Sequence, residues 1–314
     1  MAPSNDQPSR PPLPVRLFML VAARNPLDME HCHVDHAPPV RYAYLFSGLF
    51  VAYLATLPVI DALRSDQGGA ASILSEASSP LLGLFALMAL VLVYLIMGGF
   101  LARHLNGAVA LFVVGVGFSF LSAGMGGIHQ FAWSDASPWL LGVETVCWAL
   151  ATFYLVWALN RSSGGLPDVP HDWKTEPIGS WASLSSKPSL SALACSLIVL
   201  PVAWVLLADD SHGQVLGAVI LASFLAGMAG RVAAPKLDPI LIYPGVVLVG
   251  GLAQLVVVSG WSGSLADALV EQTVPRFLYV MPITWVAGSL AGVSMGVGWA
   301  RSFISEPPGT VADN

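Results

Sequence analysis

One glutamate of this chain stands inside an apolar stretch. Glu144 lies within residues 138–159, and the rest of that stretch carries no charged residue. An ionisable side chain in a membrane span costs about 2.5–3.5 kcal/mol at the centre and usually faces the protein interior. We therefore predict that the Glu144 carboxylate binds a proton or a cation. The alternative is a glutamate near the membrane interface that is hydrogen-bonded and serves helix packing.

Three further residues could act with this carboxylate. His129 and Asp135 precede it in a loop that contains no lysine or arginine. Cys147 follows Glu144 by three positions, which places both side chains on one face of a helix. The four residues together are the candidate proton or cation site. An outward-facing enzyme site built from His129, Asp135 and Glu144 would lack both a nucleophile and a recognisable metal pattern.

A second cluster precedes the first apolar stretch and offers metal ligands. Its imidazole, thiolate and carboxylate groups suit zinc or copper. The donors are His31, Cys32, His33, Asp35 and His36. The alternative is a solvated polar segment, because closed metal sites usually space their ligands as two separated pairs and no second pair is evident.

Haem and several familiar enzyme classes are not expected. His104 and His129 fall at opposite ends of neighbouring apolar stretches, so they could not hold one haem between them. The chain has no HExxH, Walker A or GxSxG motif, and no lysine inside an apolar stretch to form a retinal Schiff base.

The composition indicates an all-α polytopic membrane protein. Of 314 residues, 55% are hydrophobic and only 10% are charged, and the mean hydropathy is +0.71. Soluble domains carry about 25% charged residues. The apolar runs are continuous rather than alternating, which favours helices over barrel strands. The net charge of -6 without a basic patch excludes nucleic acid as a partner, and three distant cysteines predict no disulfide framework.

Hydropathy predicts eight membrane spans, so the lipid bilayer is the expected environment. The spans cover residues 42–60, 80–102, 107–123, 138–159, 190–207, 214–233, 239–259 and 277–300. The fifth is the least secure, because it is short and contains Pro201.

The basic residues predict the orientation of these spans. With eight spans, Arg64 and Arg276 are the only two of the 13 lysines and arginines on one side of the membrane. Lysine and arginine collect on the cytoplasmic side. Both termini are therefore expected in the cytoplasm, with the bacterial inner membrane assumed as the location and the tail, residues 1–40, retained uncleaved.

The longest loop suggests a division of the chain. Residues 161–189 form a predicted cytoplasmic linker between two four-helix halves, residues 41–160 and 190–303, with a C-terminal tail at 304–314. Four spans in each half would give parallel repeats. A short match supports this, since Pro58 and Pro201 each stand between a leucine and a valine. Chance similarity in an apolar chain is the alternative.

Glycines at four-residue spacing mark one face of the last span. Such a face lets a neighbouring helix backbone approach closely. The three glycines are Gly288, Gly292 and Gly296. Packing within the chain is the first interpretation, and the alternatives are a homo-oligomer face, a partner membrane subunit or a sliding surface in a transporter.

These observations support three hypotheses for the function. The first is a small carrier or permease that uses one buried carboxylate. The alternative is a non-catalytic membrane subunit or scaffold that packs partner helices through its glycine faces. An integral-membrane enzyme with an outward-facing site ranks behind both.

Overall fold

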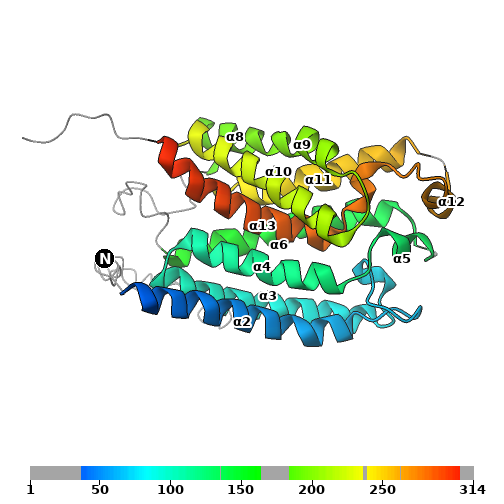
Figure 1. Ribbon diagram of the computed structural model, residues 1–314, viewed down its shortest axis with the longest axis horizontal. Coiled ribbons are helices and arrows are strands. Elements are labelled where there is room, and N and C mark those ends of the chain that lie inside the picture. The colour runs from blue at the N-terminus through cyan, green and yellow to red at the C-terminus, as the bar shows by residue number, and fades with distance from the viewer. Residues whose placement is uncertain (1–36, 135, 164–183, 236–238, 262, 305–314) are drawn as a thin grey trace, which may run out of the picture. The chain divides into compact units, whose positions relative to one another are not determined.

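The computed structural model describes residues 37–134, 136–163, 184–235, 239–261 and 263–304 (Figure 1). Within these residues the chain forms α-helices and short 3-10 helices, and two isolated β-bridges in the loop at 63–79 are its only β-pairing. Eight helical segments are long and apolar enough to cross a membrane. The predicted all-α polytopic class and the eight spans are confirmed.

The first four spans are single helices. They are α2 (Pro38–Ala62), α3 (Pro80–His104), α4 (Gly107–Gly124) and α6 (Trp139–Ser163). A short helix, α5 (Ile128–Ala132), lies in the loop before α6. The observed limits lie within a few residues of the predicted ones.

The fifth span is present but interrupted. It consists of α8 (Lys187–Ala194), the 3-10 helix η3 (Cys195–Ile198) and α9 (Val199–Leu206). Pro201 in α9 has no N–H to donate, and its ring crowds the carbonyl of the residue four positions earlier, Leu197. That carbonyl belongs to η3. The 3-10 turn therefore lies where the proline removes an α-helical hydrogen bond. Pro58, by contrast, lies inside the continuous helix α2.

The remaining spans are α10 (His212–Ala233), α11 (Ile242–Ser259) and α13 (Pro282–Ala300), with α12 (Leu265–Val270) in the loop before α13. The last span was predicted to begin at residue 277. Residues Arg276–Tyr279 instead form a 3-10 helix, η4, and α13 begins at Pro282. Proline at the first helical position loses no hydrogen bond, which explains this start.

Helix α13 is the most enclosed span. In its most apolar window 83% of the residues are buried, against 22% in α2. It packs between α4 and α10, while α6 packs against α11 (Figure 1). The exposed side chains of α2 and α3 are largely apolar, as contact with lipid requires.

The glycine face of α13 lies against α10. A Cβ atom at Gly292 would meet the carbonyl oxygen of Ile220, and one at Gly296 would meet that of Phe224. A Cβ atom at Gly288 would meet the side chain of Val219. The two backbones are therefore as close as glycine allows, and α10 occupies the face that a partner helix would use.

Two buried polar contacts join the first four spans to the last four. Ser122 of α4 and Thr284 of α13 share a hydrogen bond of 2.7 Å. Thr145 of α6 donates to Oε1 of Gln254 of α11 at 2.8 Å. Helices α4 and α11 are the third spans of their halves, and α6 and α13 are the fourth. Since α4 packs against α13 and α6 against α11, the third span of each half packs against the fourth span of the other. Parallel repeats would produce this arrangement, and the division into two halves stays a prediction.

Charge is segregated between the ends of the bundle. All described carboxylates lie at the end where α2, α4, α9 and α11 finish, here called the acidic end, together with only two arginines, Arg64 and Arg276. The opposite, basic end carries no described carboxylate. Its basic residues are Arg41, Arg103, Arg161, Lys187, Arg231 and Arg301.

Folded loops cover the acidic end. Helices α5 and α12 pack together there, and apolar side chains from three loops and from the ends of α6 and α11 form a separate buried cluster. The cluster includes Ile73, Ile128, Phe131, Leu265 and Leu278. The polar residues of these loops are therefore held on a packed base.

Candidate functional site

The Glu144 carboxylate is covered by the loop at 63–79. Its Oε2 accepts a hydrogen bond of 2.9 Å from the backbone N–H of Leu74. The indole of Trp148, one turn further along α6, lies close to the same carboxylate. The loop is folded at this point by η2 (Leu74–Glu76). Glu144 is thus turned towards the protein, as expected for a carboxylate in a span.

A second carboxylate belongs to the same polar region. Glu76 lies close enough for its charge to act on Glu144. Its Oε2 accepts from the backbone N–H of Ser72 at 3.0 Å, and its Oε1 accepts from the hydroxyl of Ser134. The Ser72 hydroxyl in turn donates to the carbonyl of Gly127 at 2.9 Å. Two acidic groups therefore face one network of backbone and hydroxyl donors.

A small cavity lies beside α6, beyond Trp148. Its volume is about 10 Å³, and its walls are almost entirely apolar. Thr152 lines it, is only 2% exposed, and has a hydroxyl without a hydrogen-bond partner among the described residues. The other lining residues are Val91, Phe118, Trp148, Ala151, Leu155, Val286 and Leu290. Glu144, Trp148 and Thr152 thus follow one another along α6 towards the middle of the span.

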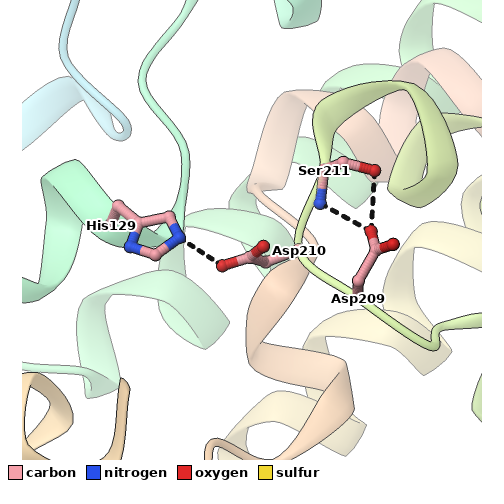
Figure 2. A network of polar contacts seen from close by, with 4 residues as sticks. All are labelled: His129, Asp209, Asp210 and Ser211. Atoms are coloured by element: carbon pink, nitrogen blue, oxygen red, sulfur yellow. Dashed lines mark hydrogen bonds and ion pairs between the residues drawn. The ribbon is translucent and has the colours of Figure 1, made fainter. Parts of the chain in front are cut away.

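His129 lies elsewhere at the acidic end. Its Nε2 forms an ion pair with Oδ2 of Asp210, which stands in the loop between α9 and α10 (Figure 2). No ion pair joins His129 to Glu144 in the described part of the chain. The structure therefore pairs His129 with Asp210, a residue that is distant in sequence.

The neighbouring Asp209 has different partners from Asp210. Its Oδ1 accepts from the backbone N–H of Ser211 at 2.9 Å and from its hydroxyl at 2.7 Å. These hydrogen bonds lower the pKa of Asp209. Figure 2 shows Asp209 directed away from His129, whereas Asp210 points towards it. The two adjacent aspartates thus have different partners.

A second cavity, here called the Asp210 cavity, adjoins the His129–Asp210 pair. Its volume is also about 10 Å³, but carboxylate, imidazole, phenol and hydroxyl groups take part in its lining. The lining residues are Gly127, Asp210, His212, Val215, Tyr279, Met281 and Thr284. Sequence reasoning missed it, although residues 207–213 carry two aspartates and a histidine with no basic residue.

The charges around this cavity shift the pKa of Tyr279, one of its lining residues. Burial raises the pKa of its phenol, the negative charges of Asp210 and Asp209 raise it further, and Arg276 opposes them. Arg276 is itself held by Trp204, since its Nη1 donates to the Trp204 carbonyl at 2.7 Å and the guanidinium lies over the indole ring.

The other predicted residues are not gathered here. Cys147 is exposed on α6, while Glu144 is covered by the loop. Asp135 lies outside the described residues, as do all five donors of the predicted zinc or copper cluster, His31, Cys32, His33, Asp35 and His36. Within the residues that are described, no three histidine, cysteine or acidic side chains are grouped to hold a metal ion.

Comparison with known protein families, curated proteins and solved structures gives no match for this chain.

Proposed function

We propose that this multi-pass membrane protein is a small carrier that moves a proton or a small cation, with Glu144 as the group that binds it. The observation that carries the proposal is a carboxylate inside a span, covered by a loop and followed along α6 by a cavity. A carboxylate in this position gives a bound cation a counter-charge at the membrane surface. The Thr152 hydroxyl, which has no partner among the described residues, gives a next polar group towards the middle of the bundle.

The charge distribution supports a cation rather than an anion as cargo. Carboxylates outnumber arginines at the acidic end, and such a field raises the local concentration of cations. Glu76 adds a second negative charge beside Glu144.

Flux into vesicles tests this proposal. Purified protein is reconstituted in liposomes that contain a pH-sensitive dye, and proton, Na⁺ and K⁺ gradients are applied in turn. Glu144→Gln should reduce flux to that of empty vesicles, because the side chain keeps its size but loses its charge. The matched control is Glu271→Gln, an exposed acidic residue at the same end. Unchanged flux in Glu144→Gln would remove this residue from the carrier.

We further propose that the acidic end faces outward and that both termini are cytoplasmic, in the bacterial inner membrane assumed above. The basic end collects most described arginines and lysines, which favours the cytoplasm. A C-terminal fluorescent-protein fusion should be bright and a C-terminal alkaline phosphatase fusion inactive. The reverse result would invert the orientation.

A second function, a non-catalytic membrane subunit, is favoured by the packing of α13. Close backbone contacts with α4 and α10 enclose this helix, and such contacts suit a rigid frame. Wild-type vesicles would then show no flux under any of the three gradients. The protein would also co-purify in mild detergent with one membrane partner in a fixed ratio.

A further inference from the structure

The Asp210 cavity has the size and the donors of a small-ion site. It has room for about one water-sized species, about 10 Å³ in volume. A buried polar site of this size holds an occupant when two to four polar groups surround it. Its lining residues include Asp210, Tyr279, His212 and Thr284, and the Thr284 hydroxyl also shares a hydrogen bond with Ser122.

The donor set points to the charge of the occupant. Hard cations prefer oxygen ligands, and Ca²⁺ takes six to eight of them, usually with several carboxylates. This cavity has a single lining carboxylate, which favours an ion of lower charge than Ca²⁺. We propose that the Asp210 cavity binds a monovalent cation, and that Na⁺, which is small and prefers oxygen ligands, is the ion it takes.

The surroundings favour a cation at this position. Asp209 adds negative charge nearby, because its carboxylate acts on the same phenol as Asp210. His129 contacts only Oδ2 of Asp210, so the second carboxylate oxygen is not part of that ion pair. The nearest arginine, Arg276, is engaged with Trp204.

Gly127 is a steric requirement of this arrangement. A Cβ atom at residue 127 would lie 2.8 Å from Nε2 of His212, closer than real contacts allow. Both residues line the cavity, so a methyl group at 127 would displace the imidazole or reduce the space. Gly217, on α10, has nothing within 4 Å of a Cβ atom and provides the matched control.

Ion binding here does not depend on the carrier function proposed for Glu144, although Gly127 of the cavity accepts a hydrogen bond from Ser72, which also donates to Glu76. A binding measurement on the detergent-solubilised full chain therefore tests it alone. The thermal midpoint is followed as NaCl replaces choline chloride at constant ionic strength. An ion that binds only the folded state raises the midpoint as its concentration increases. The wild type should show a rise that increases with the logarithm of the Na⁺ concentration above the dissociation constant.

Adjacent residues give the decisive variants. Asp210→Asn should abolish the Na⁺-dependent rise, whereas Asp209→Asn should retain it. Tyr279→Phe removes one hydroxyl and should raise the Na⁺ concentration needed for a given rise about tenfold. This variant keeps the test available if Asp210→Asn does not fold. Gly127→Ala should lose the response, and Gly217→Ala should keep it.

Two further variants separate this site from its neighbours. His129→Gln breaks the ion pair and should leave the Na⁺ response in place. Glu144→Gln should also leave it in place, so loss of the response in that variant would move the ion to Glu144. Identical midpoints in NaCl and choline chloride would overturn the proposal. Stabilisation by micromolar Zn²⁺ in place of Na⁺ would overturn it equally.

Discussion

The interior around α13 and the acidic end of the bundle are built in opposite ways. Around α13, glycines bring backbones together, and a few buried hydroxyl and amide contacts are fully enclosed. At the acidic end, folded loops carry most of the ionisable groups on a small apolar cluster of their own. Both regions are packed, but only one of them presents charge.

We infer that the interior around α13 mainly supports stability, whereas the acidic end carries the groups for ion handling. Changes near α13 alter contacts that cannot relax, since the neighbouring atoms are backbone. Changes at the acidic end alter groups that water can also solvate. We therefore expect interior substitutions to affect folding first, and substitutions at the acidic end to affect ion handling with small effects on stability.

The largest effect is expected for Gly292→Leu. A side chain there would run into the Ile220 carbonyl and the backbone of Phe224, so α10 and α13 could not pack. We expect loss of the monodisperse folded protein, a cost above about 3 kcal/mol. Size-exclusion chromatography and thermal melting measure it, with Gly217→Leu as the control. A Gly292→Leu protein with an unchanged melting temperature would contradict the packing described here.

Gln254→Leu should rank next. The side-chain amide of Gln254 donates to the carbonyls of Phe277 and Val280 and accepts from Thr145, all in the interior. Leucine would remove the amide donor to both carbonyls and one acceptor of Thr145, at a cost of about 3 kcal/mol. Gln67→Leu tests the contrast, because Gln67 makes one exposed contact, with the Trp133 carbonyl. Equal losses of melting temperature in the two variants would remove the distinction between the regions.

His129→Gln should change stability only slightly. The ion pair with Asp210 is largely exposed on the histidine side, and such pairs contribute about 0–1 kcal/mol. A shift of the melting temperature of a few degrees at most is expected at neutral pH. A loss as large as that of Gln254→Leu would show that this ion pair is a main support of the acidic end.

The smallest effect concerns the phenol of Tyr279. Burial is the main cause of its raised pKa, and Asp210 contributes a further increase. Asp210→Asn removes that negative charge and should lower the pKa of Tyr279 without restoring the ordinary value. Ultraviolet absorbance against pH measures it, with Tyr279→Phe identifying the signal. An unchanged titration would show that the charge of Asp210 does not reach the phenol.

Features that depend on local composition could be predicted from the sequence. Hydropathy located all eight spans, because a helix in lipid needs an unbroken apolar run. Glu144 could be selected because it is an isolated charge in such a run. The spacing of Gly288, Gly292 and Gly296 indicated close packing, but nothing in the spacing identified α10 as the partner.

Features that depend on how loops meet could not be predicted. His129 and Asp210 belong to different loops, and only the packing of the helices brings them together. The donor to Glu144 is the backbone N–H of Leu74, which every residue except proline possesses. Cys147 was placed with Glu144 by helical spacing, yet it is exposed while the carboxylate is covered. Helical spacing gives a direction on the helix, and the neighbours then decide what that direction meets.

The enclosure of α13 also has a consequence for biosynthesis. This helix is made after the seven other spans, and its mean hydropathy of 1.2 is the lowest of the eight. The membrane insertion machinery thus receives its least apolar span last, when the helices that will surround it are already in the bilayer. Until α13 arrives, the faces of α4 and α10 that it covers have no partner within the chain. The packing of α4 and α10 around α13 is therefore completed only after α13 has entered the bilayer.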